Sequence, residues 1–216
     1  MLKYLYRHID WEHIDVIGFD LDGTLYDEAE FIAQVYEPIA AHLAHVCDSR
    51  LSEIYTAIFK RWLEKGSSYN RIFSEQLEKF GIEGVEAQQA ISECLTLYRN
   101  FKPILTLPAR VKLLLNLCHQ KYSIFLVSDG SAALQMAKIN ALNLEHWFEP
   151  NDIGLTGLYD SQFAKPSTYI LSKIDAVGGI SKQRVVFFGD RSCDQQFAAA
   201  AGFQYVEVDV LFPRRI

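Results

Sequence analysis

Two acidic residues separated by a single residue are the first candidates for chemistry. Asp20 and Asp22 follow an apolar run that ends at Phe19, and the turn formers Gly23 and Thr24 come next. Carboxylates two residues apart in an extended chain point the same way, so both can reach one reacting group. Together they can also collect a hard cation such as Mg²⁺, which prefers oxygen ligands. Because Asp, Gly and Thr are ordinary turn residues, a plain acidic turn after a strand is the alternative.

A small hydroxyl follows a second apolar run. The stretch 122–127 ends in Ser128-Asp129-Gly130. A hydroxyl and free backbone amides between a strand and a helix can bind phosphate. Ser and Asp are equally typical of a helix cap, so both interpretations stay open for this segment.

A lysine and two more acids are the remaining candidates for chemistry. Lys165 precedes Pro166, which favours an extended conformation at the lysine and predicts a helix that begins after it. Asp190 and Asp194 follow the buried run 185–188. A lone lysine is usually a solvated surface charge, and Asp194 could simply cap a helix.

The elements that must position these residues alternate between strands and helices. After the strand that ends at Phe19, the pattern predicts strands at 122–127, 185–188 and 204–208, helices at 109–119, 131–141, 167–177 and 194–201, and an irregular segment at 152–159. This order predicts an α/β fold with a doubly wound parallel sheet. Ligands of such sheets bind at the carboxyl ends of the strands, where Asp20, Ser128 and Asp190 stand.

Between the first two predicted strands the pattern is helical. Apolar positions at three- and four-residue steps predict helices at 28–46, 49–65, 70–80 and 85–101. We therefore expect a core domain of residues 1–27 and 103–216 that carries an inserted helical domain of residues 28–102. Four residues near an inter-helix turn could line the entrance to a site or serve as ordinary packing and solvated residues: Trp62, Tyr69, Asn70 and Arg71.

Composition excludes several other classes of protein. The chain has 216 residues, of which 50% are hydrophobic and 22% charged, as in ordinary globular proteins. A net charge of −6 gives no reason to expect nucleic acid or a membrane as partner. No apolar stretch approaches the ~20 residues of a membrane span, and the N-terminus does not resemble a signal peptide. We expect a cytoplasmic protein, and the oligomeric state cannot be read from the sequence.

The ordered motifs resemble those of one family. Phe19-Asp20-Leu21-Asp22-Gly23-Thr24-Leu25 resembles the nucleophile motif of the haloacid dehalogenase-like (HAD) hydrolase superfamily. Ser128, Lys165 and the pair Asp190 and Asp194 match the other three motifs in the expected order. The helical insert lies where this superfamily carries its C1-type caps, so the fold is expected to be a Rossmann-like HAD core with a helical cap. The chain resembles the phosphatase branch, which includes small-metabolite phosphatases such as phosphoglycolate phosphatases.

This resemblance implies a role for each candidate residue. Asp20 would be the nucleophile that forms an aspartyl-phosphate, and Asp22 would act first as general acid and then as general base. Mg²⁺ would be bound by Asp20, by the backbone carbonyl of Asp22 and by Asp190. Asp194 would orient a metal-bound water or Lys165. The phosphate would be bound by Ser128, by Lys165 and by the loop at Asp129 and Gly130.

The implied substrate is a small phosphorylated metabolite. Phosphoglycolate, sugar phosphates and nucleotides are not separated by the sequence. Dehalogenation is disfavoured, because family members with that activity lack an acid at the position of Asp22. Two alternatives remain, namely a phosphosugar mutase with the same aspartyl-phosphate and a non-catalytic binding protein that retains the fold.

Overall fold

The chain folds into two compact units, and the computed structural model describes residues 2–210. One unit, here called the sheet unit, comprises Met1–Glu28 and Leu105–Ile216, and the other, the helical unit, is Ala29–Ile104. The predicted boundaries at 27/28 and 102/103 differ from these by one and two residues. Residues 211–216 of the predicted core lie outside the described residues.

A five-stranded parallel sheet forms the centre of the sheet unit, which confirms the predicted α/β fold. Its strands are β1 (Val16–Phe19), β2 (Ser123–Ser128), β3 (Ile153–Leu155), β4 (Val185–Gly189) and β5 (Gln204–Glu207). They lie in the order β3-β2-β1-β4-β5. Phe19 lies opposite Leu126 of β2 and Phe188 of β4. This register brings the residues that follow β1, β2 and β4 to the same edge of the sheet.

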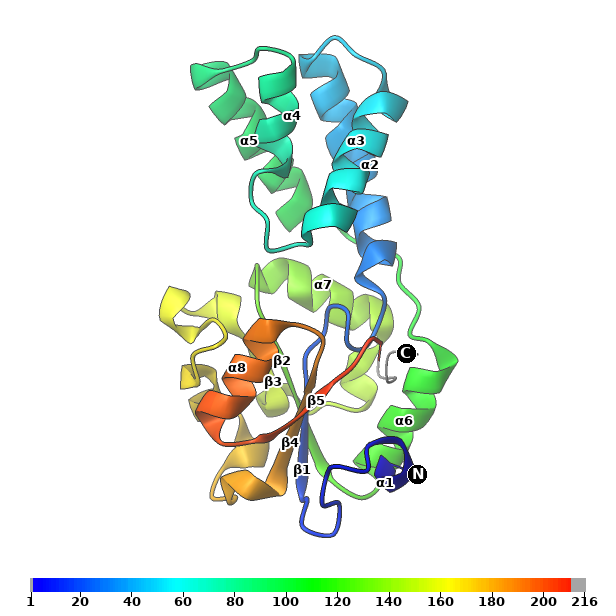
Figure 1. Cartoon of the computed structure of the whole chain (residues 1–216), viewed down its shortest axis with the longest axis vertical. Helices are drawn as coiled ribbons and strands as arrows, with labels where there is room; N and C mark the ends of the chain where they lie inside the picture. Colours follow the sequence, from blue (N-terminus) through cyan, green and yellow to red (C-terminus); the bar gives the residue numbers. More distant parts are fainter. Residues whose placement is uncertain (1, 211–216) are drawn as a thin grey trace. The chain divides into compact units, whose positions relative to one another are not determined.

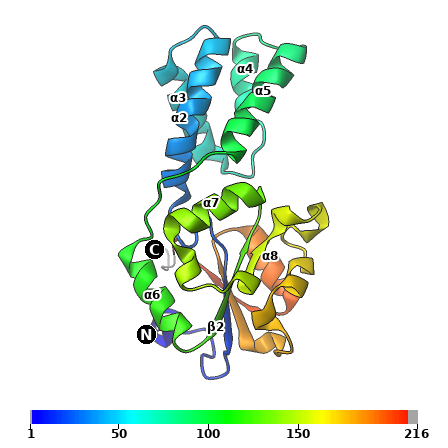
Figure 2. The same cartoon turned by 180° about the vertical axis from the view of Figure 1, so that it is seen from behind.

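The three central strands, β1, β2 and β4, are buried on both faces, as their nearly continuous apolar runs indicate. On one face the ring of Phe187 packs on Phe197 of α8 (Ser192–Ala201), with ring centroids 5.0 Å apart. On the other face Phe188 packs on Phe19 at 5.4 Å and on Tyr6 at 5.1 Å. Figures 1 and 2 show α6 (Ala109–His119) and α8 on opposite sides of the sheet. The helix α7 (Ala132–Leu142) follows β2, and a short α1 (Leu2–Leu5) precedes β1.

Two segments after α7 differ from the prediction. The segment 152–159, expected to be irregular, contains the edge strand β3, and the helix expected at 167–177 is replaced by two 3₁₀ helices, η5 (Tyr169–Lys173) and η6 (Asp175–Val177). Ile174 between them is extended and buried. Asp152 accepts a hydrogen bond from the backbone N–H of Ala176 at 2.7 Å. These tertiary contacts replace the bonds that a continuous α-helix would make.

Short 3₁₀ helices complete the connections of the sheet unit. Besides η5 and η6 they are η1 (Leu144–His146), η2 (Pro150–Asp152), η3 (Thr156–Leu158), η4 (Ser161–Phe163) and η7 (Lys182–Arg184).

The helical unit contains the four helices that the periodicity predicted. They are α2 (Glu28–Val46, whose first residue belongs to the sheet unit), α3 (Leu51–Lys65), α4 (Ile72–Lys79) and α5 (Gly84–Arg99). One apolar stripe of each helix is buried, as Ile39 of α2, Ile58 of α3, Leu77 of α4 and Cys94 of α5 illustrate. The unit therefore has a core of its own.

Candidate active site

The loop after β1 carries the first two acids into a buried position. Asp20 and Asp22 are only 6% and 7% exposed. The N–H of Asp20 donates to the carbonyl of Phe188 at 2.9 Å, and Thr24 Oγ1 donates to Asp20 Oδ2 at 3.3 Å. Gly23 turns the chain with a φ of +78°, and a Cβ there would collide with the carboxylate of Asp190. A glycine is required because the loop passes so close to Asp190.

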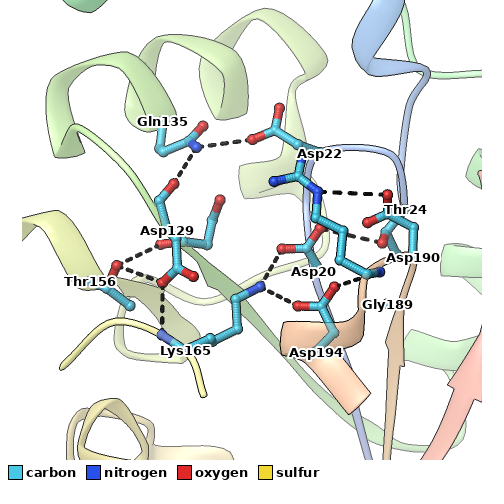
Figure 3. Close-up of polar contacts among 12 residues, drawn as sticks. Asp20, Asp22, Thr24, Asp129, Gln135, Thr156, Lys165, Gly189, Asp190 and Asp194 are labelled. Carbon is cyan, nitrogen blue, oxygen red and sulfur yellow. Dashed lines mark hydrogen bonds and ion pairs between the residues drawn. The ribbon is translucent and has the colours of Figure 1, made fainter. Parts of the chain in front are cut away.

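Lys165 lies between two of the predicted acids. Its Nζ is 2.5 Å from Asp20 Oδ1 and 2.5 Å from Asp194 Oδ1, and its side chain is almost fully buried. Figure 3 shows these contacts between side chains that come from separate segments of the sheet unit. Burial disfavours the ammonium, but Asp20, Asp194 and Asp129 outweigh burial and raise the pKa of Lys165. The lysine is therefore a permanent cation beside Asp20.

Three carboxylates form an acidic cluster at the same place. One oxygen from each of Asp20, Asp190 and Asp194 lies within 4.8 Å of the others. The pKa of Asp190 is raised to about 6, mainly by burial. Arg191 opposes this rise, and the charges of Asp194 and Glu28 add to it. Burial also raises the pKa of Asp20 to about 8, although Lys165 opposes this shift. Both shifts come mainly from burial, and the neighbouring carboxylates add to them.

The donor set fits a hard divalent cation. Asp190 Oδ1 is buried and has no hydrogen-bond donor among the described residues, so an acceptor oxygen beside the cluster is left without a partner. Carboxylate oxygens are the ligands that Mg²⁺ prefers. The carboxylate of Asp22 is outside the cluster, so only the backbone of that residue is available for the predicted ligand set.

The loop after β2 is tied to the loop that carries Lys165. Asp129 Oδ1 accepts from Thr156 Oγ1 at 2.8 Å and from the backbone N–H of Lys165 at 3.1 Å. Ser128 is buried at the end of β2, and Gly130 has a φ of +105°. The Asp129 carboxylate is thus used to join two loops. An anion could be bound in this loop by the Ser128 hydroxyl and by backbone N–H groups, but not by this carboxylate.

Three residues that the sequence analysis missed surround Asp22. Lys138 Nζ is 2.7 Å from Asp22 Oδ1, Gln135 Nε2 is 2.9 Å from Asp22 Oδ2, and the hydroxyl of Tyr26 donates to Asp22 Oδ1. Burial opposes ionisation of Asp22, but Lys138 and these hydrogen bonds hold its pKa below the ordinary value. A usable signal existed, because Gln135 and Lys138 share the face of α7 that Leu134, Ile139 and Leu142 bury.

Arg191 is a further residue that the sequence analysis missed. Its Nη2 lies 2.6 Å from Glu28 Oε2, and its Nε lies 3.8 Å from Asp190 Oδ2. Arg191 caps α8 together with Asp194, whose Oδ2 accepts from the backbone N–H of Arg191 at 3.1 Å. The third cation of the site therefore reaches the first residue of α2.

Of the four helical-unit residues proposed to line an entrance, three line a cavity within that unit. Trp62, Tyr69 and Asn70 belong to the wall of a cavity of about 460 Å³. Trp62 Nε1 also donates to Ser67 Oγ at 2.7 Å. Arg71 is outside the lining and pairs with Glu78 at 3.0 Å. The role of these residues in substrate entry stays a prediction.

Comparison with known proteins assigns the family. The model of the haloacid dehalogenase-like hydrolases matches residues 14–202, which is most of the chain. The chain belongs to the haloacid dehalogenase-like hydrolase family. The helical unit corresponds to the cap of this fold, and the resemblance drawn from the motifs is confirmed.

Individual relatives agree with this membership. A glyceraldehyde 3-phosphate phosphatase of Methanothermobacter thermautotrophicus is 26% identical over 188 residues, which are 82% of this chain and 77% of the relative. A HAD-superfamily hydrolase of subfamily IA, variant 1, from Geobacter sulfurreducens has the same fold, with a TM-score of 0.69 and 17% identity over 93% of this chain and 90% of that one.

A second solved structure was determined with a metal. It is a HAD hydrolase from Bacillus subtilis bound to magnesium, with a TM-score of 0.60 and 18% identity over 94% of this chain and 90% of that one.

Among the described residues of the present chain, none of the helices is both long enough and apolar enough to cross a membrane.

Proposed function

We propose that this HAD-family hydrolase is a Mg²⁺-dependent phosphomonoesterase that acts on a small phosphorylated metabolite through an aspartyl-phosphate on Asp20. The observation that carries the proposal is the buried Lys165 ammonium, which contacts Asp20 and Asp194 at the edge of the acidic cluster. A carboxylate nucleophile, a fixed cation and oxygen ligands for a metal are the parts that phosphoryl transfer needs.

The proposed reaction has two chemical steps. Asp22 is ionised in the free protein and takes up a proton when the phosphate ester binds. A carboxylate oxygen of Asp20 attacks phosphorus, the bond from phosphorus to the leaving oxygen breaks, and Asp22 gives that proton to the leaving alkoxide. Asp22 then takes a proton from a water molecule, whose oxygen attacks the phosphorus of the aspartyl-phosphate. Inorganic phosphate leaves and the carboxylate of Asp20 is restored. Asp22 thus serves as general acid and then as general base.

The charge of the site supports a bound Mg²⁺. Asp20, Asp190 and the backbone carbonyl of Asp22 would hold the ion, and the partnerless Asp190 Oδ1 is an available ligand oxygen. When bound, the ion neutralises negative charge on the carboxylates and on the phosphoryl oxygens. Asp194 would hold Lys165 in place, since it accepts a hydrogen bond from Lys165 Nζ.

The phosphoryl oxygens would be bound by the chain's own donors. Lys165 supplies a cation, Ser128 a hydroxyl, and the segment Asp129-Gly130 backbone N–H groups at the start of α7. Asp129 acts indirectly, because its carboxylate holds the backbone of Lys165 against the loop. Preorganised donors of this kind stabilise the charge that develops in the transition state.

The relative that acts on glyceraldehyde 3-phosphate supports a small phosphate ester as substrate. We therefore place triose phosphates first in a substrate panel, followed by phosphoglycolate, hexose phosphates and nucleoside monophosphates. Release of inorganic phosphate is measured with Mg²⁺ and with a chelator, for the wild type, for Asp20→Asn and for Asp48→Asn, an exposed acid in the helical unit.

The proposal expects release that requires Mg²⁺, is lost in Asp20→Asn and persists in Asp48→Asn. Interconversion of a sugar phosphate without release of phosphate would indicate a mutase instead. Absence of turnover from every compound by folded, Mg²⁺-bound protein would contradict the proposal and favour a binding role.

A further inference from the structure

The carboxylate of Asp22 is held by three donors from two separate parts of the sheet unit. Oδ1 accepts from Lys138 Nζ at 2.7 Å and from the hydroxyl of Tyr26, and Oδ2 accepts from Gln135 Nε2 at 2.9 Å. We call Lys138, Gln135 and Tyr26 the Asp22 cradle. Tyr26 follows β1 in the sequence, whereas Gln135 and Lys138 lie one turn apart on α7.

The cradle is fully inside the protein. The side chain of Lys138 is 2% exposed, and Tyr26 and Gln135 are 0% and 4% exposed. Burying an ammonium group is costly unless a carboxylate pairs with it, and a hydrophobic residue at position 138 would complete the apolar face of α7 at no such cost. The lysine therefore needs an explanation other than packing.

Gln135 gives a second, independent indication. Its Nε2 donates to two acceptors, Asp22 Oδ2 and the carbonyl of Asp129 at 2.5 Å, which fixes the orientation of the amide. In this orientation Gln135 Oε1 is buried without a hydrogen-bond donor among the described residues. A buried amide oxygen without a hydrogen bond lowers stability. The orientation in which Gln135 donates to Asp22 therefore has an energetic cost.

We propose that Lys138, Gln135 and Tyr26 are positioning residues that aim the Asp22 carboxyl group at the leaving oxygen, and that this makes the enzyme selective for phosphate esters of aliphatic alcohols. The inference rests on the proposed function, because it assigns the cradle to the proton transfer of that reaction. An aliphatic alkoxide is a strong base and leaves only with a proton, whereas p-nitrophenolate leaves without one. A misplaced Asp22 carboxyl group therefore slows hydrolysis of esters of aliphatic alcohols and does not slow hydrolysis of p-nitrophenyl phosphate.

The test compares two esters and two cradle variants. Values of kcat/KM, which report the steps up to the formation of aspartyl-phosphate, are measured for glycerol phosphate and for p-nitrophenyl phosphate. The variants are Lys138→Met, which removes the cation but keeps most of the side-chain volume, and Tyr26→Phe, which removes only a hydroxyl. Lys112→Met, at an exposed position of α6, is the matched control. Circular dichroism and thermal unfolding verify the fold of each variant.

General acid catalysis contributes about 10²–10⁴ in rate, so Asp22→Asn is expected to lower the glycerol phosphate value at least about a hundredfold more than the p-nitrophenyl phosphate value. Lys138→Met should show the same selective loss, of about tenfold or more, because a small misplacement of a catalytic group already costs rate. Tyr26→Phe should show it more weakly, and Lys112→Met not at all.

Combining Lys138→Met with Asp22→Asn separates positioning from a structural role. If Lys138 acts through Asp22, the double variant is no slower on glycerol phosphate than Asp22→Asn alone. Equal losses on both esters in Lys138→Met and in Tyr26→Phe, additive with Asp22→Asn, would overturn the inference and leave the proposed function intact. A wild-type chain that hydrolyses neither these esters nor any compound of the substrate panel would overturn both.

Discussion

Replacement of Asp190 by Asn should make the metal-free protein more stable at neutral pH. Asp190 is a buried carboxylate beside Asp194 and Glu28, and Arg191 compensates it only in part, so its pKa is raised from 3.8 to about 6. An acid with a raised pKa binds its proton more tightly in the folded state than in the unfolded state. The free energy of unfolding therefore falls as the pH rises from about 4 to about 6, and the loss is complete above pH 6.

The expected magnitude follows from the size of the shift. A rise from 3.8 to about 6 is roughly two pKa units, which corresponds to about 3 kcal/mol. An amide at this position carries no charge at any pH and escapes this loss. About a third of this loss has already occurred at pH 4.5, so relative to the wild type Asp190→Asn should gain about 2 kcal/mol of unfolding free energy between pH 4.5 and pH 7.5.

Urea unfolding with a chelator at these two pH values measures the gain. Asp209→Asn, at an exposed position of the same unit, is the control and should not change with pH relative to the wild type. Mg²⁺ at a hundred times its Kd should cancel most of the difference at pH 7.5, because it stabilises the wild type by ~2.7 kcal/mol and the variant lacks a ligand residue. A difference between Asp190→Asn and the wild type that is the same at both pH values would refute the reasoning.

Three other substitutions have definite expected outcomes. Lys165→Met should lower kcat at least a hundredfold, since loss of one such donor costs ~2.7–4 kcal/mol, and unchanged steady-state kinetics would contradict the role of the lysine. Gly23→Ala should lower the free energy of unfolding by at least about 1–3 kcal/mol, because a positive φ is strained for alanine and its Cβ meets Asp190; equal urea midpoints would argue against this close approach. Thr156→Val should lower the free energy of unfolding by about 1 kcal/mol, because it removes the hydrogen bond to Asp129, and it should raise KM more than it lowers kcat. A fall in kcat alone would show that this hydrogen bond between the two loops does not serve substrate binding.

The strand-end residues were predictable because the rule that places them is topological. Asp20, Ser128 and Asp190 each follow or end an apolar run, and parallel strands deliver such residues to one edge of the sheet. The register of Phe19 with Leu126 and Phe188 brings them together. Lys165 was identified only through the resemblance to the HAD motifs, since its segment reaches the site by tertiary contacts that no local pattern encodes.

The Asp22 cradle was missed for a different reason. The helix at 131–141 was predicted, but its polar residues were not assigned to a face, and the buried Lys138 pairs with Asp22 from a distant segment. The helix expected at 167–177 was wrong because Ile174 is extended and buried and the backbone N–H of Ala176 donates to Asp152 instead of to a helical carbonyl. Both errors concern contacts between segments distant in sequence.

Detection of the covalent intermediate tests the central claim most directly. The wild type and Asp20→Asn are mixed with the best phosphate ester and Mg²⁺, quenched in acid within a turnover, digested and analysed by mass spectrometry. The account predicts a phosphoryl group on the peptide that contains Asp20 in the wild type and none in the variant. Turnover of the ester by the wild type with no phosphoryl group on Asp20, or with one on another residue, would contradict it.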